Sequence, residues 1–172
     1  MKPDAARMGD NRESQEKFLF AALFLYANRL QTAGDKLDEI VTMKQWLLIV
    51  MAKQFGGEAP TLSELGSFLG CSRQNVKKLA LSLEKTGLIE LRRDGRALRV
   101  VHTEKCRRYF SRRSPHEERF LKLLYQDFDD GEITRLYRGM AKLLTGIERV
   151  EGAIAAGMLA FPQGEEPLFE RR

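Results

Sequence analysis

A cluster of polar side chains of the kinds that recognise nucleic acids lies between residues 73 and 78. Arg73, Gln74, Asn75, Lys77 and Lys78 all fall within this short stretch. Arginine pairs well with guanine, glutamine and asparagine pair with adenine, and lysine bonds either guanine or a phosphate. These residue types predict contacts with base edges and with the phosphate backbone of duplex DNA.

Other reactive side chains are few and scattered. His102 and His116 have no metal-ligand spacing, and Cys71 and Cys106 suit neither a zinc site nor a disulfide framework. Cys71 precedes a predicted helix, where a thiol pKa can be depressed, but free cysteine more often serves as a small packing residue. The sequence predicts no catalytic residue, metal or cofactor, and for both cysteines it favours packing over redox sensing.

The residues around the polar cluster match a helix-turn-helix. Gly66 is small where the second helix presses on the first, and Gly70 permits the positive φ of the turn. Thr61 and Glu64 form a capping box for the first helix, and Ser72 caps the second, which runs to about residue 85. Thr61 and Ser72 are also assigned to the DNA-binding residues. The remaining positions of the pattern also carry suitable small or apolar residues: Leu65, Leu69, Cys71, Val76 and Leu79.

The second helix presents its polar residues on the side away from its apolar face. On a helical wheel, Gln74 and Lys78 lie opposite that face. We assign Gln74, with Arg73 and Asn75 beside it, to base edges. Leu81 also falls toward the outer side, and the sequence gives no role for it.

Two short segments, 88–92 and 97–102, flank an Asp-Gly turn and predict a β-hairpin, which makes the motif a winged helix-turn-helix. Arg92, Arg93 and Arg96 would lie at its tip, beside a phosphate backbone or in a minor groove. Asp94 is expected to orient an arginine rather than to touch DNA. The alternative for the arginines is a solvated hairpin.

The charge of the chain is unevenly distributed. Residues 72–113 carry 13 Lys and Arg against 4 Asp and Glu, whereas the rest of the chain carries 16 against 20. Such a basic segment indicates a polyanion-binding surface, although charge alone is equally consistent with a solvated basic face. No stretch approaches the roughly 20 apolar residues of a membrane span, and no export signal is evident at the start, so we expect a cytoplasmic protein.

Two apolar helices indicate pairing between chains. In the last helix, apolar residues recur at alternating spacings of three and four from Ile133 to Ile154, the pattern of helix pairing. A helix over about 13–32 is also strongly apolar, which favours a layer shared by two chains over a helix packed inside its own subunit. The residues assigned to dimerisation are Phe18, Leu25, Leu136, Met140, Leu143, Ile147 and Val150.

The predicted fold is mainly α with a small β-hairpin wing, a winged helix-turn-helix joined to a helical dimerisation layer. We assign 42–113 to the winged domain, 13–41 and 114–157 to the dimerisation region, 1–12 to a disordered start and 158–172 to a flexible tail. A Thr42–Gln45 capping box starts a helix in the winged domain. Ser114-Pro115 predicts a break or sharp kink in the helix that begins near Thr103.

Several segments resemble the MarR family of winged helix-turn-helix transcriptional regulators: Met43–Trp46, Pro60–Leu65, Cys71–Lys78, Arg96–Arg99 and Thr103–Lys105. The resemblance covers roughly residues 15–155 and departs in a shorter wing and in the break at residue 114. It implies a homodimer that binds a pseudo-palindromic operator in double-stranded DNA, often as a repressor. A winged helix that works only through protein contacts is the alternative, and the basic face argues against it.

The resemblance also implies a small-molecule effector site between the dimerisation layer and the winged domain. Phe20, Phe24, Trp46 and Tyr109 are the aromatic residues that would line such a site. Aromatic residues at helical spacing also pack into cores, and that alternative stays open here. The operator, the regulated genes and the effector do not follow from the sequence.

Overall fold

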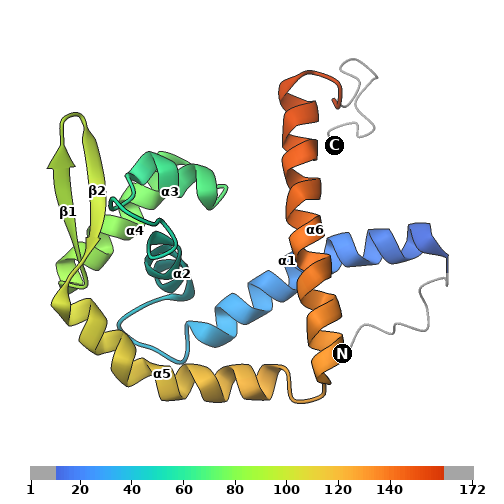
Figure 1. Cartoon of the computed structure of the whole chain (residues 1–172), viewed down its shortest axis with the longest axis horizontal. Coiled ribbons are helices and arrows are strands. Elements are labelled where there is room, and N and C mark those ends of the chain that lie inside the picture. Colours follow the sequence, from blue (N-terminus) through green and yellow to red (C-terminus); the bar gives the residue numbers. More distant parts are fainter. Residues whose placement is uncertain (1–10, 161–172) are drawn as a thin grey trace, which may run out of the picture. The chain divides into compact units, whose positions relative to one another are not determined.

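The computed structural model describes residues 11–160, which form helices and a single two-stranded sheet (Figure 1). The elements, in chain order, are α1 Arg12–Gly34, α2 Met43–Ala52, α3 Leu62–Phe68, α4 Arg73–Thr86, β1 Ile89–Asp94, β2 Ala97–His102, α5 Glu104–Leu124 and α6 Asp130–Ala155. The prediction of a mainly helical fold with one hairpin is confirmed. The chain divides into two compact units at Ser114/Pro115, and the predicted disorder of 1–12 and 158–172 lies mostly outside the described residues.

The core of the first unit lies where α2, α3, α4 and the hairpin meet. Leu48, Leu65, Leu83 and Val100 come from these four elements and are almost completely buried. Burying a side chain of this size stabilises a fold by about 1.5–3 kcal/mol. Cys106 of α5 joins the same cluster, so the start of α5 is held against the winged domain.

Side-chain caps fix the starts of the helices that enter this core. In the Thr42–Gln45 box the two reciprocal hydrogen bonds measure 2.9 and 3.3 Å, and the box predicted at Thr61 is also present. The Gln45 side chain further donates to Ser82 Oγ at 3.0 Å, which joins α2 to α4. Asp129 caps α6, which therefore begins at Asp130, before the first residue of the apolar pattern, Ile133.

The hairpin is longer and its turn tighter than predicted. Ile89 pairs with His102 and Asp94 pairs with Ala97, so only Gly95 and Arg96 lie in the turn. Gly95 has a φ of 56°, as such two-residue turns require. The strands therefore extend to the tip of the wing.

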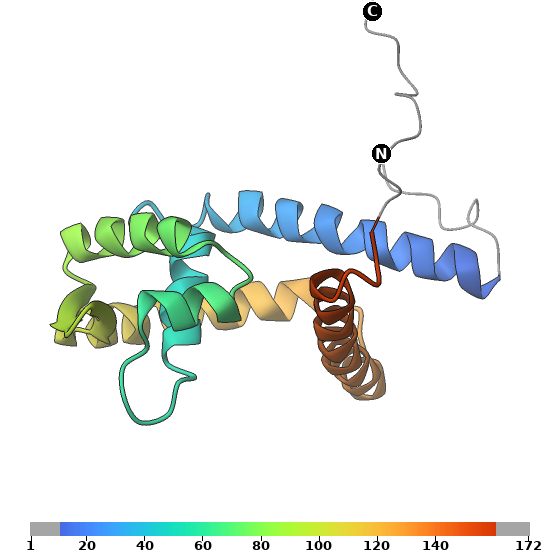
Figure 2. The same cartoon turned by 90° about the horizontal axis from the view of Figure 1, so that it is seen from above.

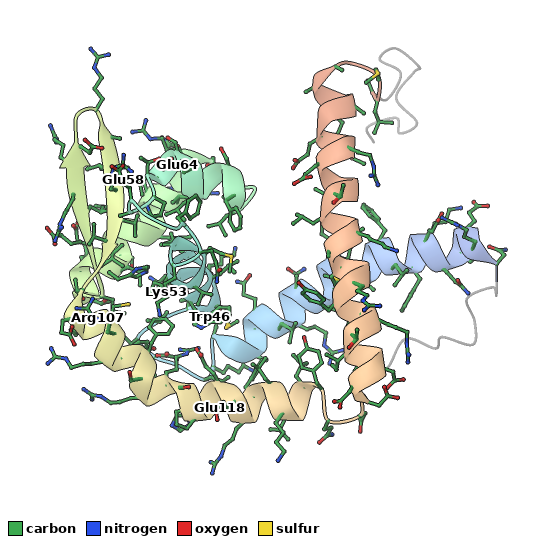
Figure 3. All side chains as sticks on the ribbon, in the orientation of Figure 1. Trp46, Lys53, Glu58, Glu64, Arg107 and Glu118 are labelled. Carbon is green, nitrogen blue, oxygen red and sulfur yellow. The ribbon has the colours of Figure 1, made fainter. Side chains whose placement is uncertain are left out.

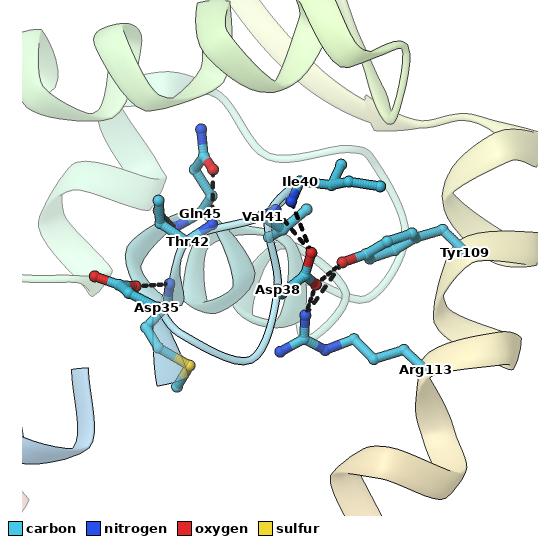
Figure 4. A network of polar contacts seen from close by, with 9 residues as sticks. Asp35, Asp38, Ile40, Val41, Thr42, Gln45, Tyr109 and Arg113 are labelled. Carbon is cyan, nitrogen blue, oxygen red and sulfur yellow. Dashed lines mark hydrogen bonds and ion pairs between the residues drawn. The ribbon is translucent and has the colours of Figure 1, made fainter. Parts of the chain in front are cut away.

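A network around one carboxylate joins the loop before α2 to α5 (Figure 4). Asp38 accepts hydrogen bonds from the backbone N–H groups of Ile40 and Val41 at 2.8 and 3.2 Å. Its other oxygen accepts from the Tyr109 hydroxyl and is ion-paired with Arg113. Only 12% of each ionic side chain is exposed. In this mostly buried site each charge needs the other as its partner.

Helix α5 continues through Pro115, so of the two predicted alternatives at Ser114-Pro115 the break is wrong and the kink stays a prediction. A proline inside a helix removes one i→i−4 hydrogen bond and crowds the preceding turn, at a cost of about 3 kcal/mol. The helix nevertheless extends on both sides of this position, from Glu104 to Leu124. The signal for a new helix start was local, and the surrounding helix overrides it.

Two helices expose much of their apolar surface within the described chain. No residue of α6 is buried, and its seam residues remain 38–57% exposed from Leu136 to Ile154. Helix α1 is a single long rod (Figure 2) in which only Ala22 and Gly34 are buried. Monomeric proteins rarely expose continuous apolar stripes of this kind.

Candidate nucleic-acid interface

The helix-turn-helix depends on a close approach between α3 and the start of α4. A Cβ added at Gly66 would lie 2.9 Å from the backbone oxygen of Cys71 and 3.5 Å from the nitrogen of Arg73. The Cys71 N–H donates to the Gly66 carbonyl at 2.8 Å, and Gly70 has a φ of +61°. Both glycines therefore have the roles that the sequence predicted for them.

Helix α4 has one buried side and one polar side. Val76, Ala80 and Leu83 are buried, and Leu79 packs partly against the core. Ser72 caps the helix through the Asn75 N–H at 3.3 Å. The predicted readers and phosphate contacts on α4 are all exposed: Arg73, Gln74, Asn75, Lys77 and Lys78.

One apolar side chain interrupts the polar side of α4. Leu81 is 41% exposed, and its spacing places it in a row with Gln74, Lys78 and Lys85 along the helix. Nothing in the structure explains a leucine at this position.

The hairpin arginines are not equivalent. Arg92 donates to the Glu90 carboxylate at 3.1 Å, which raises the pKa of Arg92 and lowers that of Glu90. Arg93 and Arg96 are exposed, and within residues 11–160 neither side chain forms an ion pair or a hydrogen bond. Arg93 and Arg96 are therefore better placed to meet a phosphate than Arg92.

Asp94 orients an arginine, as predicted, but this arginine is Arg99, for which the sequence predicted no role. Arg99 donates from Nε to the Asp94 carboxylate at 2.7 Å, and it also pairs with Glu58. A period-two strand pattern gives no indication that Arg99 faces these carboxylates, because both the loop and the turn must first be in place.

Thr61 lies at the start of α3 and is partly buried. Its hydroxyl accepts from the Glu64 N–H at 3.2 Å, and its own N–H donates to the Glu64 carboxylate at 2.7 Å. These bonds lower the pKa of Glu64. The Thr61 hydroxyl is therefore already engaged in a helix cap, and its contact with DNA stays a prediction.

Both cysteines were predicted to serve as packing residues, and only Cys106 does so. Cys106 is buried, and burial raises the pKa of its thiol. Cys71 is exposed, so the prediction that its side chain packs inward is wrong. The constraint at position 71 acts through the backbone oxygen against Gly66, and the thiol itself lies at the surface near the Leu69 carbonyl.

The predicted effector-site aromatics occupy separate places. Phe20 and Phe24 contact each other edge to face at 5.2 Å and are mostly exposed on α1. Trp46 and Tyr109 pack against the core, and Tyr109 bonds Asp38. A cavity of about 360 Å³ lies instead between the end of α2 and β2, and none of the four lines it.

Between residues 11 and 160, no group of His, Cys, Asp and Glu side chains is arranged to hold a metal ion. Nor does any helix in that range have the length and apolar character needed to cross a bilayer.

Comparisons of structure identify similar folds, although no protein-family model and no curated protein sequence matches the chain. A MarR/EmrR family transcriptional regulator from Acinetobacter sp. ADP1 is 18% identical, with a TM-score of 0.67 over 78% of this chain and 97% of that one. MepR in the S. aureus MepR–DNA complex is 16% identical, with a TM-score of 0.62 over 74% and 96%. Bordetella bronchiseptica BpsR, whose DNA binding is regulated by 6-hydroxynicotinic acid, is 16% identical, with a TM-score of 0.61 over 73% and 98%.

These likenesses establish the fold. The chain has the winged helix-turn-helix fold of the MarR-family transcriptional regulators, with helices before and after the winged domain. The match covers nearly the whole length of each compared protein.

The close approach at Gly66 gives the first prediction. Gly66→Ala should destabilise the first unit by about 1–3 kcal/mol, because the added methyl group overlaps the Cys71 oxygen and forces α3 and α4 apart. Chemical denaturation followed by circular dichroism measures the change. Ser67→Ala, at an exposed position of the same helix, is the control and should alter stability by less than about 0.5 kcal/mol. Equal stabilities of the two variants would contradict the crossing described here.

Proposed function

We propose that this chain is a transcriptional regulator that binds double-stranded DNA sequence-specifically, as a homodimer on a pseudo-palindromic operator. The observation that carries the proposal is the exposed polar side of α4, next to a hairpin that presents Arg93 and Arg96. A helix of this kind fits the major groove, and a basic hairpin beside it reaches the adjacent backbone or minor groove.

Within α4 the polar residues divide by what they can bond. Gln74, with Arg73 and Asn75 in the first turn, reads base edges, because these side chains match adenine or guanine in pairs of hydrogen bonds. Lys77 and Lys78 neutralise phosphates. Ser72 and Thr61 cap the N-termini of α4 and α3, and helix N-termini favour phosphate groups.

The second subunit is a second copy of this chain. The exposed seam of α6, with α1, supplies the apolar surface that such an interface needs. Two subunits related by a two-fold axis present two copies of α4, and this symmetry requires a two-fold related DNA site. Burial of the seam would remove the exposed apolar side chains of α6 from water.

We further propose repression as the mode of regulation and a small molecule as its effector. A bound dimer covers the DNA of its operator and blocks access to an overlapping promoter. The regulation of BpsR by 6-hydroxynicotinic acid supports an effector for a protein of this fold. The action on operator DNA would take place in the cytoplasm.

Binding should depend steeply on salt. Release of condensed counterions by the basic residues should lower the affinity for duplex DNA at least 100-fold between about 50 and 200 mM salt. Footprinting on a genomically selected fragment should show two protected half-sites about 10 bp apart, one for each α4. A footprint without two-fold symmetry, or an affinity indifferent to salt, would count against this function.

Base readers and phosphate contacts should respond differently to substitution. Gln74→Ala should cost about 1–3 kcal/mol on the preferred operator and should relax the preference at one base pair. Arg93→Ala should weaken binding to all sequences alike. It should also make the salt dependence of the affinity shallower, by the amount that one phosphate contact contributes. The measurement is the affinity of each variant for a panel of single-base operator changes. If Arg93→Ala abolished one base preference while Gln74→Ala changed none, the two assignments would be reversed.

The seam of α6 should hold the dimer together. Leu143→Asp/Ile147→Asp places two charges in the apolar stripe, so it should dissociate or unfold the protein at micromolar concentration. Light scattering gives the mass, and circular dichroism distinguishes a folded monomer from an unfolded chain. Lys142→Asp/Glu148→Lys, which changes polar neighbours outside the seam, should remain dimeric. A stable dimer of the first variant would exclude the seam as the interface.

A further inference from the structure

Arg99 turns its guanidinium toward the protein. Only 24% of the side chain is exposed. Nε donates to the Asp94 carboxylate at 2.7 Å, Nη1 donates to the Ala59 carbonyl at 2.7 Å, and Nη2 lies 2.9 Å from the Glu58 carboxylate. The three nitrogens of one side chain therefore reach three acceptors, which come from the end of β1 and from the loop before α3.

The backbone reinforces the same junction. The Val100 N–H donates to the Pro60 carbonyl at 2.8 Å, and Thr61 forms an isolated antiparallel bridge with Arg99. Glu58 lies beside the hairpin in the side-chain view (Figure 3). Strand β2 is thus joined to residues 59–61, which lead directly into the helix-turn-helix.

The two carboxylates that Arg99 binds are negatively charged, so they would repel the phosphates of DNA. Asp94 is next to Arg93 in the hairpin and is 59% exposed, and Glu58 is 82% exposed. Interactions between exposed charges extend over about 8–10 Å at physiological salt. A phosphate that contacts Arg93 or Arg96 would therefore be repelled by an unneutralised Asp94.

We propose that Arg99 is a positioning residue for DNA binding, which offsets one of the two negative charges of Glu58 and Asp94 and fastens the hairpin to the loop before α3 without itself contacting DNA. This inference rests on the proposed function. It separates Arg99 from Arg93 and Arg96, although all three belong to the same hairpin. Its guanidinium is already occupied by protein acceptors, whereas theirs are open to a phosphate.

The test compares Arg99→Ala with the triple variant Glu58→Gln/Asp94→Asn/Arg99→Ala. In the triple variant neutral amides replace both carboxylates, so no cationic partner is needed. Affinities and salt slopes are measured for the duplex that the unaltered chain enriches from a random pool. Arg99→Ala should bind about tenfold more weakly, and the triple variant should recover to within about threefold of Glu58→Gln/Asp94→Asn, with the same salt slope. Arg107→Ala removes another internally paired arginine and is the matched control, with less than a twofold change expected.

A triple variant that stays as weak as Arg99→Ala overturns the proposal. A salt slope shallower by about 0.9 would then identify Arg99 as a direct phosphate contact. Amide exchange at Val100, measured without DNA, should accelerate in Arg99→Ala because the junction with Pro60 is loosened. Unchanged exchange would refute the fastening role. If the unaltered chain enriches no duplex, the proposed function fails, whereas the exchange measurement still decides the role of Arg99 in the hairpin.

Discussion

The contact between Gly66 and the backbone of Cys71 is the constraint on which the candidate interface depends. It brings α4 against α3 at a distance that no side chain on Gly66 would allow. With α4 held there, Val76 and Leu83 enter the core and the opposite side of the helix must face solvent. The polar side of α4 is therefore exposed as a consequence of packing. The hairpin follows α4 after Gly87, which has a left-handed conformation. Its position is fixed by the same core, in which its residues Ile89 and Val100 are buried.

The basic segment 72–113 contains charges of two kinds. Some of its arginines are engaged by carboxylates within the protein and contribute little net charge to the surface around them. These pairs are Arg92 with Glu90, Arg99 with Glu58 and Asp94, Arg107 with Glu104, and Arg113 with Asp38. Of the other Lys and Arg residues in this segment, six lie on α4 and at the tip of the hairpin, and three lie on the first half of α5. A count of charges along the sequence overstates the size of that surface and leaves its position undefined.

What the sequence could predict is what local chemistry determines. Capping boxes, the Asp-Gly hairpin and the buried side of α4 each depend on residues a few positions apart, and the structure confirms them. The errors and omissions concern residues whose surroundings come from elsewhere in the chain. Arg99 contacts a loop some 40 positions away, Cys71 is constrained through its carbonyl, and Pro115 is carried by the helical turns on either side of it. The predicted DNA and dimer contacts involve a second molecule, which no single chain displays.

The continuity of α5 through Pro115 has a mechanical consequence. Proline has no N–H, so the Ser111 carbonyl lacks the amide partner that it would find in an uninterrupted helical ladder. At that turn, α5 can bend without breaking a hydrogen bond, and elsewhere along the helix the same bend would stretch one. The turn also coincides with the division between the two compact units. Helix α5 therefore resists bending least at the turn that precedes Pro115.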